Sequence, residues 1–250
     1  MGEHVDSAER NACGDLGTGG LIRSVGVSRF GAGATLDIAP GIRWVRMPLP
    51  FSLDHVNLWL IEDGKGWAAV DTGISLDMLK DNWRKLLTQH RLTRQIVTHC
   101  HPDHLGLAAW LEQETGAPLW ITQGEFAFGH LLRAGTDAFG IAAMLQLYRR
   151  HGLDDARLAA LEARGNGFLR GVPEMPQTYR RIMDGDQMII GGKNWQVIVG
   201  YGHAPEHASL YCDELHVLVS GDMLLPRIST NVSVLAPNPD GNPLALELAA

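Results

Sequence analysis

The chain has little cysteine and no long apolar run. Its three cysteines, Cys13, Cys100 and Cys212, show no metal-finger spacing, so we expect free thiols in a reducing compartment. The first twenty residues lack the apolar core of a signal peptide. No apolar run approaches the roughly 18 residues that a membrane-spanning helix needs. These absences predict a cytoplasmic protein with no membrane partner.

Positive charge is also scarce. Lys and Arg together number 21 against 28 Asp and Glu, which gives a formal net charge of −7. Nucleic-acid-binding domains usually carry a basic surplus, so no nucleic-acid partner is expected. Hydrophobic residues make up 45% of the 250 residues, enough for a sizeable core in one large domain. We therefore expect a globular protein whose partner is a small-molecule substrate.

The pattern along the chain predicts an arm followed by one domain. Residues 1–38 are rich in Gly, Ser and Asp, which favours a flexible N-terminal arm before a domain over 39–250. Helical spacing at 76–89 and 105–115 alternates with strand patterns at 41–47, 56–62, 67–71, 94–98 and 118–122. A helical insertion at about 123–180 precedes further strand patterns at 186–190, 195–199 and 216–220. This order predicts an α/β layered fold with a lid or pocket wall.

A dense group of metal-ligand types follows the strand at 94–98: His99-Cys100-His101-Pro102-Asp103-His104. Side chains two residues apart on a strand face the same way, so the imidazoles of His99 and His101 can face one point. Imidazole and carboxylate groups are ligands of zinc. A histidine-rich surface loop is the alternative. It is disfavoured because His203 and Asp222 also follow strand patterns, where open α/β sheets place their ligands.

This combination of motifs resembles the metallo-β-lactamase-fold hydrolase superfamily, in particular its glyoxalase II-like branch. The pattern H-x-H-x-D-H is followed by Gly202-His203 and Gly221-Asp222, each at a strand end. Asp71-Thr72-Gly73 matches the D-T-G turn of that family, and the strand at 57–61 is similar to its early N-x-Y-L-I strand. The resemblance covers about residues 40–235. It implies an αβ/βα sandwich with a metal site at one edge.

The resemblance also implies two groups of ligands: His99, His101 and His203 for one metal, and Asp103, His104 and a bridging Asp222 for the other. Family members add one more histidine from a later strand, whereas this chain has no histidine after His216. A helix start at 242–243 lies close to the chain end. We therefore expect the C-terminal strand and helix of the family to be missing, with the second metal dependent on a substitute ligand.

Several neighbouring residues have two interpretations. His207 is expected to support the site, with substitution for the missing ligand as the alternative. Glu206 stands where the family often has glycine and adds a carboxylate near the site. Cys100 is expected to pack in the core rather than to bind metal, and Asp71 to be a supporting or turn residue.

Residues further from the motif are less specific. His55 is expected to be structural, although a substrate contact is an alternative. Arg227 is expected to be solvated, or else to meet an anionic substrate group. The apolar residues of the insertion are expected to form its core, with one or two facing a substrate: Phe126, Phe128, Phe139, Met144 and Tyr148.

The implied chemistry is hydrolysis by a metal-bound hydroxide acting on a small ester, thioester or lactone. Zinc is the expected metal, one or two ions per chain, with iron or manganese as alternatives. Asp103 is the expected catalytic residue, because a ligand at that position can orient the nucleophile and accept its proton. The alternatives are a phosphodiesterase or ribonuclease of the same superfamily, and a catalytically impaired truncated module that associates with itself as a homo-oligomer.

Overall fold

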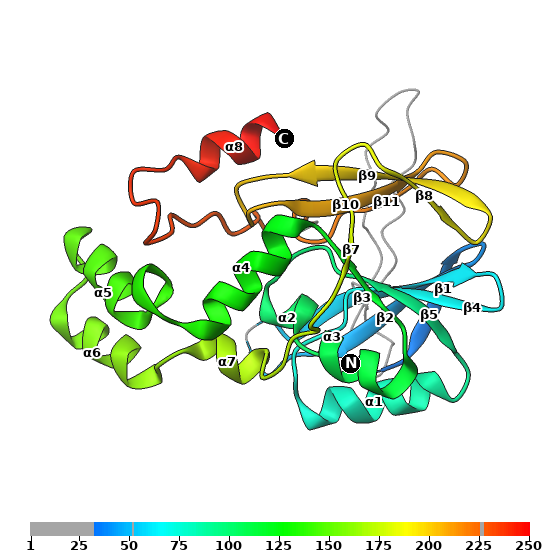
Figure 1. The fold of residues 1–250 in the computed structure, drawn as a ribbon, viewed down its shortest axis with the longest axis horizontal. Helices are drawn as coiled ribbons and strands as arrows, with labels where there is room; N and C mark the ends of the chain where they lie inside the picture. The colour runs from blue at the N-terminus through cyan, green and yellow to red at the C-terminus, as the bar shows by residue number, and fades with distance from the viewer. Residues whose placement is uncertain (1–32, 52, 226–227) are drawn as a thin grey trace, which may run out of the picture.

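The computed structural model describes residues 33–250 except 52 and 226–227. Two β-sheets stack on each other and helices surround them (Figure 1). Sheet A contains seven strands in chain order: β1 (Thr35–Ala39), β2 (Ile42–Pro48), β3 (His55–Asp63), β4 (Gly66–Val70), β5 (Leu92–Ile96), β6 (Leu119–Ile121) and β7 (Arg180–Arg181). Sheet B contains four, in the order β11 (Val217–Val219), β10 (His207–Cys212), β9 (Lys193–Gly200) and β8 (Gln187–Ile190). The predicted α/β sandwich is confirmed.

Sheet A changes from antiparallel to parallel pairing along the chain. The β3–β4 hairpin turns at Gly64, which has a φ of 65° that favours glycine. From β4 onward neighbouring strands pair in parallel, through connections that contain α1 (Asp77–Leu87), α2 (Pro102–Leu105) and α3 (Ala108–Thr115). Because the carboxyl ends of β4, β5 and β6 then lie at one edge, the turns that follow them meet there.

The core divides into layers that hold this edge in place. Between the sheets, Ile61 and Ile96 of sheet A pack in one cluster with Trp195, Val197 and Leu210 of sheet B. On the other face of sheet A, α1 and α3 form a second cluster with β2, β3 and β4. Each buried leucine-sized side chain contributes about 1.5–3 kcal/mol, so the strand ends rest on a rigid base.

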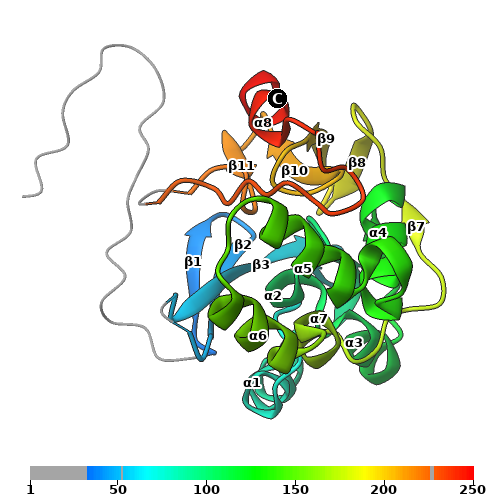
Figure 2. The same ribbon diagram turned by 90° about the vertical axis from the view of Figure 1, so that its left-hand side faces the viewer.

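The predicted insertion is helical from its start. It contains α4 (Gln123–Ala134), a 3₁₀ turn (Asp137–Phe139), α5 (Ile141–Arg150), α6 (Asp155–Arg164) and α7 (Gly167–Gly171). These helices gather beside the sheets rather than over a sheet face, as both views show (Figure 1, Figure 2). Phe126 and Phe128 pack into the cluster under α4, where Phe126 stacks on Tyr179. Met144 is half-buried and Tyr148 is 38% exposed on α5.

Several boundaries differ from the predictions. β1 begins at Thr35, inside the predicted arm, because Thr35 pairs with Val45 of β2; residues 1–32 of that arm lie outside the described residues. The insertion lies between β6 and β7, and its last helix ends at 171. The predicted helix at 105–115 is interrupted after Gly106, because the Leu107 N–H donates to the Gly73 carbonyl oxygen at 3.0 Å instead of to the preceding helical turn.

The end of the described chain is a short helix, α8 (Pro243–Ala249). Asn242 accepts a hydrogen bond from the Ala245 N–H, which confirms the helix start expected at this position. α8 packs against the turn at Gly202, where a Cβ would lie 2.6 Å from the Pro243 carbonyl oxygen. Among the described residues, no helix combines the length and apolar character needed to span a lipid bilayer.

Candidate metal centre

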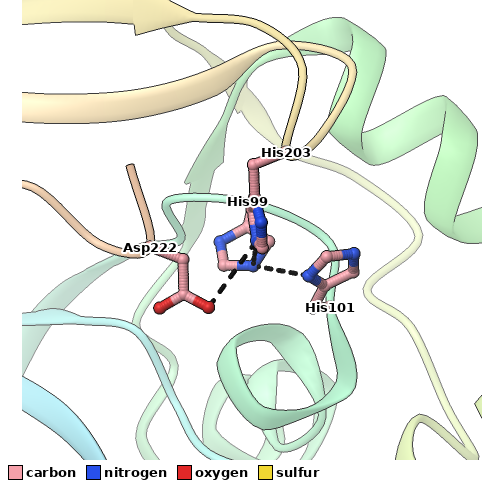
Figure 3. A group of neighbouring side chains, drawn as sticks. All are labelled: His99, His101, His203 and Asp222. Atoms are coloured by element: carbon pink, nitrogen blue, oxygen red, sulfur yellow. Dashed lines mark hydrogen bonds and ion pairs between the residues drawn. The ribbon is translucent and has the colours of Figure 1, made fainter. Parts of the chain in front are cut away.

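Side chains from both sheets converge at the edge where the strands end (Figure 3). His99 and His101 follow β5, His203 lies between β9 and β10, and Asp222 follows β11. One ligand atom from each of these four residues lies within 4.8 Å of the other three. The turn after β5 and the two turns of sheet B therefore build one cluster from distant parts of the chain.

Three imidazole nitrogens of this cluster face one another. His99 Nε2 lies 3.0 Å from His101 Nδ1 and 3.1 Å from His203 Nε2. His203 Nδ1–H donates to the carbonyl oxygen of Asn231 at 2.8 Å, and His99 Nδ1 lies 3.0 Å from the Thr98 hydroxyl. The Thr98 hydroxyl donates to Asp71 and therefore accepts from His99 Nδ1–H. A neutral imidazole has one N–H, so Nε2 of both rings presents a lone pair to the cluster. Tetrahedral zinc holds its nitrogens roughly 3.3 Å apart, so a cation between these nitrogens fits their spacing.

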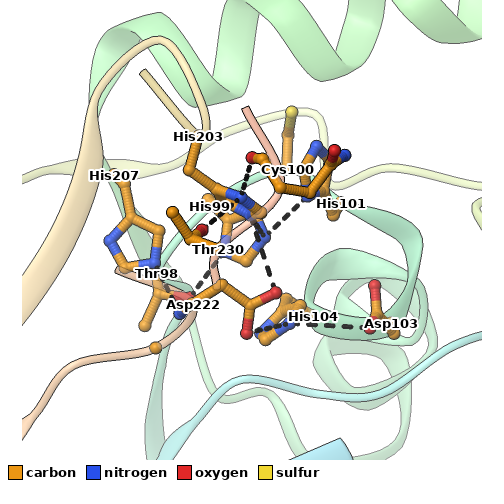
Figure 4. Close-up of polar contacts among 12 residues, drawn as sticks. Thr98, His99, Cys100, His101, Asp103, His104, His203, His207, Asp222 and Thr230 are labelled. Atoms are coloured by element: carbon orange, nitrogen blue, oxygen red, sulfur yellow. Dashed lines mark hydrogen bonds and ion pairs between the residues drawn. The ribbon is translucent and has the colours of Figure 1, made fainter. Parts of the chain in front are cut away.

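A second group lies beside the first and shares Asp222 with it (Figure 4). His104 Nδ1–H donates to Asp71 Oδ2 at 2.8 Å, so the other ring nitrogen, Nε2, faces the carboxylates of Asp222 and Asp103. That nitrogen is buried without a hydrogen-bond partner, 3.4 Å from Asp222 Oδ1 and 3.7 Å from Asp103 Oδ2. Asp222 Oδ2 lies 3.6 Å from His203 Nε2. A ring nitrogen between two carboxylates is a position where a cation can replace a proton, and Asp222 stands between the two groups.

The charges of the cluster also suit a cation. Burial lowers the pKa of His99 well below its usual value and that of His101 to about 4, so both rings are neutral at pH 7. Burial alone would raise the pKa of Asp222, but its hydrogen bond and charge interaction with His104 lower it. Burial alone would lower the pKa of His104, yet the carboxylates of Asp71 and Asp103 raise it, so the metal-free ring holds a proton at Nε2 that a bound cation would replace. Neutral imidazoles beside carboxylates are the forms that bind divalent metals.

Two further side chains hold the ligands rather than joining them. Asp71 is 1% exposed and accepts the Thr98 N–H at 2.8 Å in addition to the bond from His104. His207 Nε2 accepts the backbone N–H of Asp222 at 3.1 Å, and its ring stacks on His99. The two residues thus have the supporting contacts expected of them.

The other predicted residues lie outside the cluster. Cys100 packs in the apolar core under α4. The Glu206 carboxylate is directed to the start of α4, not to the metal ligands. His55 lies at the start of β3 and pairs with Asp54 and Arg46. Arg227 lies outside the described residues.

Sequence reasoning missed three residues that contact the ligand-bearing turns. Asn231 accepts from the His203 ring, Glu247 of α8 accepts the His203 N–H at 3.2 Å, and Glu125 of α4 contacts two of the turns. Glu125 stands in the first turn of a helix, where acidic residues are common on exposed surfaces as well. Nothing in its local sequence marks it as buried.

Comparison with known proteins agrees with the site. A family model described as Metallo-beta-lactamase superfamily matches residues 52–248. "Probable metallo-hydrolase YqgX" of Bacillus subtilis (strain 168) is 24% identical over 130 residues, which are 52% of this chain and 48% of that protein. The chain thus spans about half the length of this curated relative.

Two solved structures are more similar. A beta-lactamase domain protein from Burkholderia ambifaria is 45% identical, with a TM-score of 0.79 over 89% of this chain and 66% of that one. The metallo-beta-lactamase family protein TTHA1429 from Thermus thermophilus is 29% identical, with a TM-score of 0.70 over 85% and 69%. The glyoxalase II-like branch and the missing C-terminal elements stay predictions. With the family model covering most of the chain and the cluster at the expected strand ends, the chain belongs to the metallo-beta-lactamase superfamily.

Proposed function

We propose that this chain is the metal-binding domain of a zinc-dependent hydrolase that acts on a small ester, thioester or lactone. The convergence of three imidazole nitrogens with the carboxylate of Asp222 carries this proposal. In it, His99, His101 and His203 hold one zinc ion. Asp103 and His104 hold a second, and Asp222 contacts both. The relative named a probable metallo-hydrolase supports the hydrolase assignment for the part of its length that matches.

Zinc bound at such a site lowers the pKa of water to near 7 and polarises a carbonyl oxygen. The chain's own residues orient the reactants. The side chains of Asp103 and Asp222 are each 26% exposed, so both carboxylates face solvent as well as the histidines. In the proposal Asp103 orients the attacking water and accepts its proton, because its carboxylate lies on the open side of the cluster. His104 is 2% exposed and held by Asp71, so in the proposal its only role is to bind zinc.

The substrate class follows from charge and shape. A formal net charge of −7 disfavours polyanions, so small acyl compounds are preferred over nucleic acids. The insertion helices lie beside the sheets near the edge that carries the cluster, and they are the proposed wall for an acyl group (Figure 2). This choice depends on loops and inserts rather than on the ligands, which the whole superfamily shares.

Metal content and a substrate panel test the proposal together. The zinc-loaded protein is assayed on a chromogenic ester, a thioester, a lactone and bis-nitrophenyl phosphate, with elemental analysis of the same sample. We expect about two zinc ions per chain and hydrolysis of an acyl substrate that Asp103→Ala lowers by at least about 100-fold. Faster cleavage of the phosphodiester, or turnover within a few-fold of wild type in Asp103→Ala, would overturn it. Iron or manganese in the purified protein would change only the metal assignment.

A further inference from the structure

Glu125 is a fully buried carboxylate outside the metal cluster. It lies in the first turn of α4 and is 0% exposed. Burial raises its pKa, as expected for a carboxylate removed from water. A buried carboxylate is unfavourable unless hydrogen bonds compensate the lost hydration. Both oxygens of the Glu125 carboxylate therefore need hydrogen-bond donors inside the protein.

Each oxygen of Glu125 accepts a backbone N–H from a different ligand-bearing turn. Oε2 accepts the N–H of Cys100, between His99 and His101, at 2.8 Å. Oε1 accepts the N–H of Glu206, three residues after His203, at 2.7 Å. One side chain thus connects the turn after β5 in sheet A to the turn between β9 and β10 in sheet B.

A second glutamate crosses in the opposite direction. Glu206 Oε2 accepts the N–H of Gly124 at 2.7 Å, at the start of α4, and the Glu206 carbonyl accepts from the Thr122 hydroxyl at 2.8 Å. A Cβ at Gly124 would lie 2.7 Å from the Glu206 carboxyl carbon, so only glycine leaves room for this contact. The two glutamates form a reciprocal pair, which we call the glutamate clasp.

We propose that Glu125 is a positioning residue of the metal centre, which sets the distance between the His99–His101 turn and the His203 turn through the clasp. The inference rests on the proposed metal site. Two charge-assisted bonds from one rigidly held carboxylate fix both backbones, and the three facing nitrogens depend on the relative position of those backbones. Groups that orient ligands in this way change metal affinity by about 10–100-fold when they are replaced.

The clasp has an asymmetry that makes it testable. Glu125 uses both oxygens, whereas one oxygen of Glu206 accepts the Gly124 N–H. In Glu125→Gln the amide NH₂ must face a backbone N–H, so one hydrogen bond is replaced by a contact between two donors. In Glu206→Gln the amide oxygen can keep the bond to Gly124. The same chemical change should therefore have different effects at the two crossing positions.

The experiment compares zinc affinity and stability in matched variants. Zinc dissociation constants come from competition with a chromophoric chelator, well below the melting temperature. Cobalt-substituted protein gives an absorption spectrum that reports ligand geometry. Melting of the metal-free protein measures the fold alone. Glu162→Gln, at an exposed glutamate of α6, controls for the loss of one negative charge.

We expect Glu125→Gln to weaken zinc binding by about 10–100-fold and to alter the cobalt spectrum. Glu206→Gln and Glu162→Gln should stay within about threefold of wild type, because each keeps the bonds that position the ligands. If Glu125→Gln lowers the melting temperature of the metal-free protein but binds zinc as wild type does, the proposed role is wrong.

Two further results are separable. If the wild-type protein binds no zinc, the proposed function fails together with the role of Glu125. If the wild-type protein binds zinc and Glu125→Gln binds it with the same affinity, only the role of Glu125 is overturned. If Glu125→Gln does not fold, Glu125→Asp replaces it. That variant keeps the charge but is one methylene too short to reach both N–H groups, and the same zinc comparison decides the outcome.

Discussion

The two halves of the metal cluster differ in how firmly their side chains are held. In the first half, His99 is 0% and His203 8% exposed, and each ring has its second nitrogen at a hydrogen-bonding group. In the second half His104 is similarly fixed, but the side chain of Asp103 is 26% exposed, as is that of Asp222, which the two halves share. His99 and His203 are thus held in place before a metal binds, whereas the carboxylate of Asp103 has to be ordered when the second ion binds.

This difference indicates what determines the metal affinity of each half of the cluster. Fixing an exposed side chain costs conformational entropy, up to roughly 1.5–2 kcal/mol for the longest side chains and less for aspartate. In the histidine half, contacts with Thr98 and Asn231 already order the rings of His99 and His203 in the folded protein, so metal binding loses no further entropy there. We therefore expect unequal metal binding at the two positions, and each variant below changes one half more than the other.

The largest effect is expected from removing a ligand of the first half. His203→Ala deletes a nitrogen that faces His99 and also the hydrogen bond to Asn231. Zinc affinity of the first position should fall by more than about 100-fold, because a ligand matters more than the groups that orient it. Elemental analysis after dialysis and chelator competition measure this. Retention of two zinc ions in His203→Ala would contradict the assignment.

Asp71→Asn should affect the second half selectively. Its amide can still accept from Thr98, but the NH₂ then faces His104 Nδ1, which carries the hydrogen in the wild-type arrangement. The ring must move its proton to Nε2, so the lone pair near Asp222 and Asp103 is lost. We expect binding of the second zinc to weaken about 10–100-fold while the first is retained.

The same variant should lose about 1–3 kcal/mol of folding free energy if the ring keeps its tautomer, because two buried donors then face each other. Stoichiometric zinc titration separates this from the metal effect. Loss of both ions at equal concentration would show that the halves do not differ in the way proposed.

Chelator removal tests the comparison without a substitution. Increasing chelator should release one zinc equivalent before the other, with dissociation constants that differ by about tenfold for each 1.4 kcal/mol of ordering cost. The remaining equivalent should belong to the histidine half. Cobalt spectra recorded during the titration identify it, since nitrogen-rich and oxygen-rich sites absorb differently. A single concerted release would contradict unequal positions.

The candidate ligands could be named from sequence because most of them are local. His99 to His104 form one short run, and each later ligand follows a strand pattern in a glycine-containing turn. Those patterns can be recognised without knowing how the chain packs, since they depend on backbone geometry at strand ends. The α/β order was equally readable from alternating periodicities up to residue 123.

The elements that sequence missed lack a periodic pattern. β10 is buried on both faces over almost its whole length, so it shows no alternation of apolar and polar residues. Glu125 and Asn231 act through contacts with residues 25 or more positions away along the chain. Such contacts are set by how the two sheets and α4 pack, which no local pattern encodes.

The smallest effect is expected from Glu247 in α8. Its carboxylate accepts the His203 N–H at 3.2 Å, longer than either bond of Glu125, and it holds one turn rather than two. α8 makes this contact from the outside of the molecule, with its leucines exposed. Glu247→Ala should therefore cost about 1 kcal/mol or less and change zinc affinity by less than about fivefold. Chelator competition at the temperature used for Glu125→Gln measures it, with Glu247→Gln as the control that keeps an acceptor. A loss as large as that of Glu125→Gln would mean that the His203 turn needs support from both sides, and that the ordered histidine half depends on α8 as much as on α4.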